Sequence, residues 1–365
     1  MNQEPRIVII TGANSGIGKA VTERFAVEGY RVVMACRSTE RAAPVREEIL
    51  HRTSTKTIDL MELDTSSRES IDSFVRNFTA QYPRVDIVIH NAAYFNHGEP
   101  YRVNQEGMEI AFATNVIGPY LLTTLLREHL SKSEDPRVLN VGSNIIKHFF
   151  SPKMAMDLSD LDGSPAQHAA ATGSTDPIGS SVYKRYCRSK MALLMLTRAL
   201  SEELRPHGIA VNYLQVNGAK LSTETVRKFS LAFRILGRVQ SLFLKPPEFM
   251  ADRYYQIVTS PEFRGVTGQN INHRLEIMQP APTTTPEGKP LRFADVMRIA
   301  TGADYYPAIA EDKELQAAVM QVCRNAGNLY AIHNEDAAER YRSDDVLSLA
   351  HEDGEYYTAG KRQRI

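Results

Sequence analysis

Residues 7–18 read Ile-Val-Ile-Ile-Thr-Gly-Ala-Asn-Ser-Gly-Ile-Gly, and this stretch decides the fold. Its four leading apolar residues predict a short buried strand. Ile17, Val21 and Phe25 then recur at helical spacing, and Gly29 is placed to end that helix. Glycines let a ligand approach the backbone, and a helix N-terminus offers free N–H groups and a positive dipole end. The stretch therefore predicts a phosphate-binding turn in an α/β fold.

The glycines of this turn, Gly12, Gly16 and Gly18, have the spacing G-x-x-x-G-x-G instead of the commoner G-x-G-x-x-G. A glycine triplet alone is weak evidence for a nucleotide site, and the flanking strand and helix strengthen it. The turn residues expected to contact a dinucleotide are Gly12, Asn14, Ser15, Gly16, Ile17 and Gly18.

The composition predicts a soluble globular protein. Apolar residues make up 42% of the 365 residues, and 43 Lys and Arg balance 43 Asp and Glu. This balance leaves no overall field to attract nucleic acid or an anionic membrane. The three cysteines, Cys36, Cys187 and Cys323, match no zinc spacing, so we expect no metal and a reducing compartment. No apolar run reaches 18 residues and no signal-peptide core is present, so we expect a cytoplasmic location and no integral membrane anchor.

The segment after the first helix predicts which nucleotide binds. Arg31–Cys36 has the composition of a second strand, and Arg37 and Ser38 follow it directly. NAD-selective folds carry an acidic residue at this strand end, whereas an arginine there pairs with the 2′-phosphate of NADP. We therefore expect NADP(H), held in part by Arg37 and Ser38. A solvated surface arginine is the alternative interpretation.

Helices and strands alternate along the first three quarters of the chain. Helices are expected over 39–50, 66–81, 104–130 and 183–204, and further strands over 57–63, 85–93, 136–141 and 209–216. This alternation predicts a Rossmann-type doubly wound parallel sheet with helices on both faces. The long connections 144–182 and 220–250 follow strand ends that border the ligand crevice, and we expect a substrate flap and lid there. The residues expected to line this apolar mouth are Phe149, Phe150, Phe229 and Phe233.

Four residues farther along are candidates for catalysis. Asn115 lies inside the apolar stretch 111–126, where an Asn is unfavourable in a helix and needs partners if buried. Ser143 ends a predicted strand at the edge where α/β sheets bind ligands. Tyr186 and Lys190 are spaced i, i+4 and share one helix face. Each candidate has a plain structural alternative: a core Asn bonding locally, a Ser capping a turn, and a surface Tyr–Lys pair.

Taken in order, these motifs resemble those of the short-chain dehydrogenase/reductase family. Residues 11–19 read Thr-Gly-Ala-Asn-Ser-Gly-Ile-Gly-Lys, residues 34–37 read Met-Ala-Cys-Arg, and residues 186–190 read Tyr-Cys-Arg-Ser-Lys. All three resemble the retinol-dehydrogenase-like branch, and the resemblance covers residues 5–278. The chain departs from the family pattern at Ala93, Gly142 and Asn217-Gly218, where the family usually has Gly, Ser and Pro-Gly.

The resemblance implies a role for each candidate. Tyr186 would be the general acid/base, and Lys190 together with a bound nicotinamide would lower its pKa from about 10. Ser143 would hydrogen-bond the substrate oxygen, and Asn115 would position a water next to Lys190. Asp64 would lie beside the adenine pocket, cap the next helix, or do both. The residues implied in cofactor binding beyond the glycine turn are Arg37, Ser38, Asp64, Asn91, Ala92, Tyr186 and Lys190.

This constellation predicts an NADP(H)-dependent oxidoreductase that interconverts a carbonyl and an alcohol on an apolar small molecule. A catalytically idle NADP(H)-sensing protein on the same fold stays open, because Gly142 and Asn217-Gly218 depart from the pattern. Reduction of a C=C bond, which uses the same Tyr and Lys, also stays open. The helices over 104–130 and 183–204 carry more apolar residues than one face can bury, so we expect a homodimer or homotetramer.

The composition changes after residue 278. Residues 279–292 are rich in Pro and Thr and predict a linker behind an NADP-binding domain over 1–278. Residues 293–365 predict a mostly helical C-terminal extension. Its expected helices cover 293–301, 312–326 and 335–350, and a polar tail begins at 353. No chemical motif occurs in this extension.

Overall fold

A computed structural model describes residues 4–53, 55, 57–95, 101–151, 154–156, 182–217, 245–284, 288–289 and 291–331. The chain divides into two units, Met1–Cys323 and Arg324–Ile365. The second unit is described only over residues 324–331, which are the end of a helix. The sheet and the candidate site belong to the first unit.

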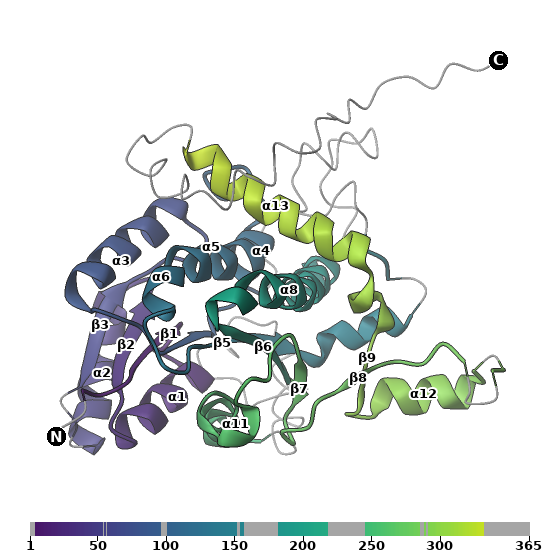
Figure 1. The fold of residues 1–365 in the computed structure, drawn as a ribbon, viewed down its shortest axis with the longest axis horizontal. Coiled ribbons are helices and arrows are strands. Elements are labelled where there is room, and N and C mark those ends of the chain that lie inside the picture. The colour runs from purple at the N-terminus through teal and green to yellow at the C-terminus, as the bar shows by residue number, and fades with distance from the viewer. Residues whose placement is uncertain are drawn as a thin grey trace, which may run out of the picture. The chain divides into compact units, whose positions relative to one another are not determined.

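Seven parallel strands form the central sheet (Figure 1). They are β1 Ile7–Thr11, β2 Arg31–Cys36, β3 Ile58–Glu62, β4 Ile87–His90, β5 Arg137–Ser143, β6 Ala210–Val216 and β7 Asn270–Asn272. Their order is β3-β2-β1-β4-β5-β6-β7, so the chain runs outward from β1 to β3 and returns to place β4 beside β1. Such a reversal is where doubly wound sheets bind their ligands. The predicted Rossmann-type sheet is confirmed.

Helices cover both faces of this sheet. The α-helices of the described residues are α1 Gly16–Val27, α2 Thr39–Thr53, α3 Arg68–Gln81, α4 Ile110–Phe112, α5 Gly118–Leu125, α6 Arg127–Leu130, α8 Val182–Leu204, α11 Pro247–Thr259, α12 Phe293–Thr301 and α13 Lys313–Ala331, of which α12 and α13 follow the last strand of the sheet along the chain. Helix α1 packs against α11 on one face, whereas α3, α5 and α8 lie on the other (Figure 1). Because both faces are covered, the central strands β1 and β2 carry nearly continuous apolar runs instead of alternating apolar and polar residues.

The single helix predicted over residues 104–130 is wrong. Val103 and Glu109 instead form an antiparallel bridge, and the Glu109 carboxylate accepts from the Phe112 N–H at 2.9 Å to start α4. A π-helical turn, Ala113–Ile117, separates α4 from α5. Leu126, with φ −91° and ψ 0°, then separates α5 from α6. These interruptions depend on caps and contacts that the apolar spacing does not reveal.

The apolar residues that motivated the predicted assembly are mostly buried within the chain itself. The buried ones are Leu121, Leu122, Leu126, Met191, Leu194, Met195 and Leu196. They are covered because α5 packs against α3 and the π-turn, and because α8 packs between the sheet and that turn. The apolar excess inferred from the sequence is therefore internal packing, and self-association stays a prediction without that support.

Helix α11 was not predicted, and its first residues fall inside the lid expected over 220–250. Met250, Tyr254 and Ile257 are buried in the core beneath α1. The flap begins as a 3₁₀ helix, Asn144–Phe150, with Phe149 buried. Most of the rest of the expected flap and lid, residues 157–181 and 218–244 with Phe229 and Phe233, lies outside the described residues.

The segment after β7 is more structured than a linker and a separate extension. Strand β8, Gln279–Pro280, lies within the predicted linker and pairs with β9, Tyr305–Tyr306. Helix α12 has the predicted bounds, and α13 begins at Lys313 and continues to Ala331. Ion pairs of 2.8 Å for Arg198–Glu311 and 2.9 Å for Glu202–Lys313 join this segment to α8. The helix predicted over 335–350 and the tail lie outside the described residues.

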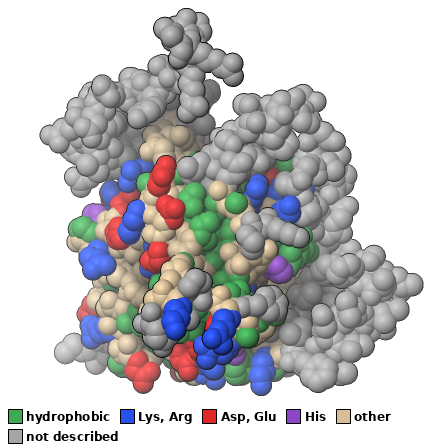
Figure 2. All heavy atoms as spheres, turned by 90° about the vertical axis from the view of Figure 1, so that its right-hand side faces the viewer, with side chains coloured by type: hydrophobic (Ala, Val, Ile, Leu, Met, Phe, Trp, Pro, Cys, Tyr) green, Lys and Arg blue, Asp and Glu red, His purple; other side chains and the backbone are tan. Residues whose placement is uncertain are grey.

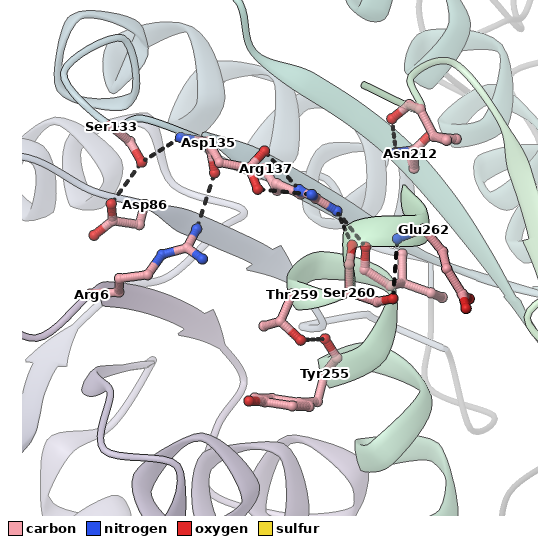
Figure 3. A network of polar contacts seen from close by, with 12 residues as sticks. Arg6, Asp86, Ser133, Asp135, Arg137, Asn212, Tyr255, Thr259, Ser260 and Glu262 are labelled. Carbon is pink, nitrogen blue, oxygen red and sulfur yellow. Dashed lines mark hydrogen bonds and ion pairs between the residues drawn. The ribbon is translucent and has the colours of Figure 1, made fainter. Parts of the chain in front are cut away.

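A buried arginine joins the amino end of β5 to the end of α11 (Figure 3). The Arg137 guanidinium, 2% exposed, donates to the Asp135 carboxylate at 2.8 and 3.0 Å. It also donates to the carbonyls of Ile257 at 3.2 Å and Ser260 at 3.4 Å. Arg6 donates to the backbone carbonyl of Asp135 at 3.1 Å. This network anchors α11 to the sheet.

The face drawn in Figure 2 carries Lys and Arg interspersed with Asp and Glu, and hydrophobic side chains gather along its middle. No helix in the described part of the chain is long and apolar enough to cross a membrane. Within the same residues, no cluster of three or more His, Cys, Asp or Glu could hold a metal ion. All three cysteines are buried free thiols.

Candidate functional site

The glycine turn forms a cradle between β1 and α1. Gly12 has φ +64° and Gly16 has φ +52°, a left-handed backbone that glycine adopts without strain. Ser15 is the N-cap of α1, and no side chain bonds the N–H groups at this described helix start. A Cβ at Gly18 would lie 2.2 Å from the Gly12 carbonyl oxygen. The turn can therefore present backbone N–H groups to a phosphate at close range.

The end of β4 holds the cradle in place. The Asn91 side chain donates from Nδ2 to the Thr11 carbonyl at 3.0 Å and to the Gly12 carbonyl at 3.3 Å. The Ala92 N–H donates to Oγ1 of Thr11 at 2.9 Å. Asn91 and Ala92 thus set the shape of the glycine turn from the neighbouring strand, while Ala93 is exposed beside them.

Arg37 follows β2 at the rim of the cradle. Its side chain is exposed and makes no hydrogen bond or ion pair with another described residue. Oγ of Ser38 accepts from the Arg41 N–H at 3.2 Å at the start of α2. Cys36, directly before, is buried, and burial raises the pKa of its thiol to about 11, although N–H groups of the glycine turn oppose that shift. No carboxylate stands at these three positions to repel a phosphate.

Asp64 does not cap the helix after β3. Ser67 is the N-cap of α3, and its side chain accepts from the Ser70 N–H. Oδ1 of Asp64 instead accepts from the N–H of Ser66 at 2.9 Å and from its hydroxyl at 2.7 Å. Asp64 therefore shapes the loop before α3, and the helix predicted from Ser66 begins at Arg68.

Asn115 lies in the π-turn and is buried, with its side-chain amide bonded on both sides. Its Oδ1 accepts from the Tyr94 N–H at 2.7 Å, and its Nδ2 donates to the Tyr94 carbonyl at 3.0 Å. Nδ2 also donates to Oγ of Ser189 at 3.0 Å. The side chain thus joins the loop after β4 to the α8 residue directly before Lys190. The alternative of a core Asn with only local bonds does not hold, because these partners are 21 and 74 residues away.

Ser143 ends β5 and serves two neighbours. Its Oγ accepts from the Ile145 N–H at 3.3 Å, which caps the 3₁₀ helix of the flap. The same side chain hydrogen-bonds the phenol of Tyr186. The capping alternative and the predicted position beside Tyr186 are therefore both correct descriptions of Ser143.

Tyr186 is partly covered on α8. Phe95 packs edge-on against its ring with 4.8 Å between ring centroids. Burial raises the pKa of Tyr186 to about 12, and the hydrogen bond with Ser143 offsets only part of that rise. The lowering expected from Lys190 is not found in the protein alone.

Lys190 is buried on the same face of α8, with Nζ 5.9 Å from the centroid of the Tyr186 ring. Its ammonium donates to the Val141 carbonyl at 2.8 Å. Burial lowers the pKa of Lys190 to about 7, since the charged form loses water. The structure thus brings Ser143, Tyr186 and Lys190 together at the carboxyl end of β5, and Asn115 reaches the same helix through Ser189.

The sequence reasoning missed two residues of this site. Ser189 lies directly before Lys190, and nothing in the local sequence pattern indicates that its hydroxyl is buried. Phe95 lies in a loop after β4 without periodicity. The i, i+3 and i, i+4 spacing around Asn115 and Tyr186 could not reveal either contact, because both partners are far away in the sequence.

Comparisons with known proteins find sequences and folds that this chain resembles. A family model described as short chain dehydrogenase matches residues 6–152. Retinol dehydrogenase 13 of Homo sapiens is 29% identical over 287 residues, covering 77% of this chain and 80% of that protein. The chloroplastic short-chain dehydrogenase TIC 32 B of Brassica napus is 30% identical over 268 residues, covering 72% and 78%. A solved Shigella flexneri short chain dehydrogenase complexed with NADP has a TM-score of 0.55 at 21% identity, covering 74% of this chain and 97% of that one.

Proposed function

Since the chain belongs to the short-chain dehydrogenase/reductase family, in its retinol-dehydrogenase-like branch, we propose that it is an NADP(H)-dependent oxidoreductase. It interconverts a carbonyl and an alcohol on an apolar small molecule. The observation that carries the proposal is the Tyr186 phenol, hydrogen-bonded by Ser143 and flanked by Lys190, at the strand edge that also holds the glycine cradle.

The residues of the cradle fit a dinucleotide. The uncapped start of α1 and the close approach at Gly18 favour a pyrophosphate on the backbone N–H groups of Gly12–Gly18. Arg37, exposed and without a partner among the described side chains, favours a 2′-phosphate, and the Shigella flexneri relative complexed with NADP is consistent with that choice. When bound, NADPH supplies the hydride that the carbonyl carbon accepts.

Tyr186 supplies the proton in this proposal. With a pKa near 12 the phenol is protonated at neutral pH, so it can donate to the carbonyl oxygen as negative charge develops there. Ser143 donates a hydrogen bond to the same oxygen and stabilises that charge. Lys190, whose pKa of about 7 lies near neutrality, can return a proton toward the phenolate. The buried side-chain bonds of Asn115 keep α8 in register with the loop after β4.

Replacing Tyr186 with Phe tests the proposal. The ring and its contact with Phe95 stay, while the proton donor is lost, so kcat for carbonyl reduction should fall about 10²- to 10⁴-fold. NADPH binding and the melting temperature should change little. Tyr183→Phe is the matched control on the same helix, because Tyr183 is 40% exposed and has Cys187 instead of Lys at i+4. A Tyr186→Phe protein within a few-fold of wild-type kcat would refute the assignment.

Arg37→Ala tests the choice of NADP over NAD. A charge-assisted bond to the 2′-phosphate contributes roughly 1.5–3 kcal/mol, or about ten- to a hundredfold in affinity. Calorimetry should show NADPH binding weakened by that factor and NADH binding unchanged. Arg76→Ala, which removes an exposed arginine from α3, is the charge-matched control. Equal wild-type affinities for NADPH and NADH would contradict the prediction.

Two other activities are compatible with the same residues. Asn217, in place of the usual Pro, bonds Nδ1 of His273 through its amide at 3.0 Å, so the loop after β6 starts differently from the family pattern. This favours an idle NADP(H) sensor as the second candidate, and the sensor would bind NADPH without oxidising it. Following NADPH absorbance with ketones, aldehydes and enones separates carbonyl reduction, C=C reduction and no turnover.

We also propose a cytoplasmic location and self-association, which fractionation and light scattering would test.

A further inference from the structure

The side chain of Tyr213 lies between the two elements that carry Ser143 and Lys190. Tyr213 is in the middle of β6 and is fully buried. Its hydroxyl accepts a hydrogen bond from the Ser143 N–H at 3.2 Å. The same hydroxyl donates to the backbone carbonyl of Lys190, also at 3.2 Å. One phenol therefore joins the end of β5 to α8 at the two residues whose side chains flank Tyr186.

Gly142 gives the Tyr213 ring its place. A Cβ at Gly142 would lie 1.8 Å from Cζ and 2.1 Å from the hydroxyl oxygen of Tyr213, where no side chain fits. The position directly before Ser143 therefore has to lack a side chain for the phenol to reach the Ser143 N–H. The absence of a side chain at Gly142 and the buried position of the Tyr213 ring therefore depend on each other.

A second contact joins the same two elements. Nζ of Lys190 donates to the Val141 carbonyl at 2.8 Å, two residues before Ser143. The last three residues of β5 are thus held to α8 by the Lys190 ammonium and by the Tyr213 phenol. Burial raises the pKa of Tyr213 far above neutrality, so its hydroxyl keeps the proton that it donates. The phenol can then donate and accept at once over the whole working pH range.

We propose that Tyr213 is a positioning residue that sets the distance between Ser143 and the Tyr186–Lys190 pair, and that Gly142 exists in this chain to admit it. This inference rests on the proposed function, since it gives Tyr213 a part in the same reaction without contact with the substrate. A displacement of about 1 Å in a reacting group can cost about 10²-fold in rate, so a bond that fixes two backbones is worth more to turnover than to stability.

Tyr213→Phe tests this role, because the ring still fills the space at Gly142 and only the hydroxyl is removed. We expect kcat to fall about tenfold or more, with substrate KM and NADPH affinity little changed. In a Ser143→Ala background the same change should lower kcat by less than ~3-fold, because the group to be positioned is already gone. Additive losses would overturn the proposal.

Tyr306→Phe is the matched control. Tyr306 is also buried, and its hydroxyl bonds Arg198 and Glu311 instead of the catalytic residues. This variant loses a hydroxyl of the same kind, so it measures the structural cost alone, and its kcat should equal that of wild type. A Tyr306→Phe protein that loses as much kcat as Tyr213→Phe would show a general effect of destabilisation and overturn the positioning role.

Amide hydrogen exchange gives a readout that does not need turnover. Peptides covering residues 141–145 and 188–192 should exchange faster in Tyr213→Phe, because the Ser143 N–H loses its acceptor, and should be unchanged in Tyr306→Phe. Unchanged exchange, or faster exchange with wild-type kcat, would overturn the inference. A wild-type protein that reduces no substrate would overturn the proposed function instead, and the exchange result would still decide whether Tyr213 holds the two elements.

A second pair of variants tests the steric argument. Gly142→Ala should lower kcat in the wild-type background, because its methyl group displaces the Tyr213 ring. In a Tyr213→Ala background the space is free, and adding Gly142→Ala should change kcat and melting temperature little. Equal effects of Gly142→Ala in both backgrounds would refute the coupling between the two positions.

Discussion

Replacing Gly18 with Ala tests the close packing of the glycine turn. Gly18 lies in the first turn of α1 with ordinary helical φ, so the backbone itself accepts Ala. The added Cβ would lie 2.2 Å from the Gly12 carbonyl oxygen and 2.6 Å from Nδ2 of Asn91. Ordinary contact begins at 3.4 Å, so the Gly12 carbonyl has to move by roughly 1 Å. The change therefore disturbs both the cradle and the bond that shapes it.

The opposing terms decide the sign of the effect. Ala in place of Gly in a helix stabilises by about 1 kcal/mol when nothing else changes. Overpacking costs about 1–3 kcal/mol, and loss of the Asn91 bond to the Gly12 carbonyl costs about 1 kcal/mol more. The free energy of unfolding should fall by about 1–3 kcal/mol. The displaced turn should also weaken NADPH binding by about tenfold or more, since its N–H groups no longer converge.

Urea unfolding and a fluorescence titration with NADPH measure the two effects. Gly29→Ala is the control, because Gly29 has φ +81° and no atom within 4 Å of its Cβ position. It should lose about 1 kcal/mol through backbone strain and keep wild-type NADPH affinity. If Gly18→Ala were as stable as wild type and bound NADPH equally well, the reasoning about the cradle would be refuted.

Two further changes test the rest of the fold. Arg137→Ala removes the guanidinium that joins Asp135 to the end of α11, and it should lower the free energy of unfolding by about 3 kcal/mol in urea, whereas exposed Arg76→Ala should stay within about 0.5 kcal/mol. Burial lowers the pKa of His90 to about 3, so between pH ~6.5 and ~3 the unfolded state binds a proton that the native state does not. The free energy of unfolding should therefore decrease by about 1.4 kcal/mol for each unit by which the pH is lowered across that window. His90→Asn should flatten this slope when unfolding is compared at about pH 7 and 5, and an unchanged slope would assign the acid sensitivity to other groups.

The sequence by itself determined the elements whose signals are local. Ile7–Thr11 and Arg31–Cys36 could be predicted as strands because the centre of a parallel sheet covered on both faces favours continuous apolar runs, here Ile7–Ile10 and Val32–Cys36. The glycine turn could be recognised because Gly12 and Gly16 need left-handed backbone and Gly18 needs the absence of a Cβ. Helix α12 was predicted with its full bounds because its apolar residues recur at helical spacing within its own nine residues.

Only the tertiary structure decided how the candidate residues relate to one another. Asn115 bonds Tyr94 and Ser189, which are 21 and 74 residues away, and such partners have no local spacing. The same is true of Tyr213. Its position in an apolar strand predicts a core residue, and the sequence does not indicate that its hydroxyl bonds the backbone of both Ser143 and Lys190. Periodicity records which face of an element is buried, and it does not record what that face meets.

The direction of the pKa shifts also depended on the fold. A Tyr and a Lys at i, i+4 predict a lowered tyrosine pKa, yet the pKa of Tyr186 is raised to about 12 and that of Lys190 is lowered to about 7. Desolvation sets both directions, and it follows from packing by β5, the π-turn and Phe95, which are distant in the chain. The sequence thus identified which groups are candidates for the chemistry, while burial within the assembled fold decided the direction of their pKa shifts in the protein alone.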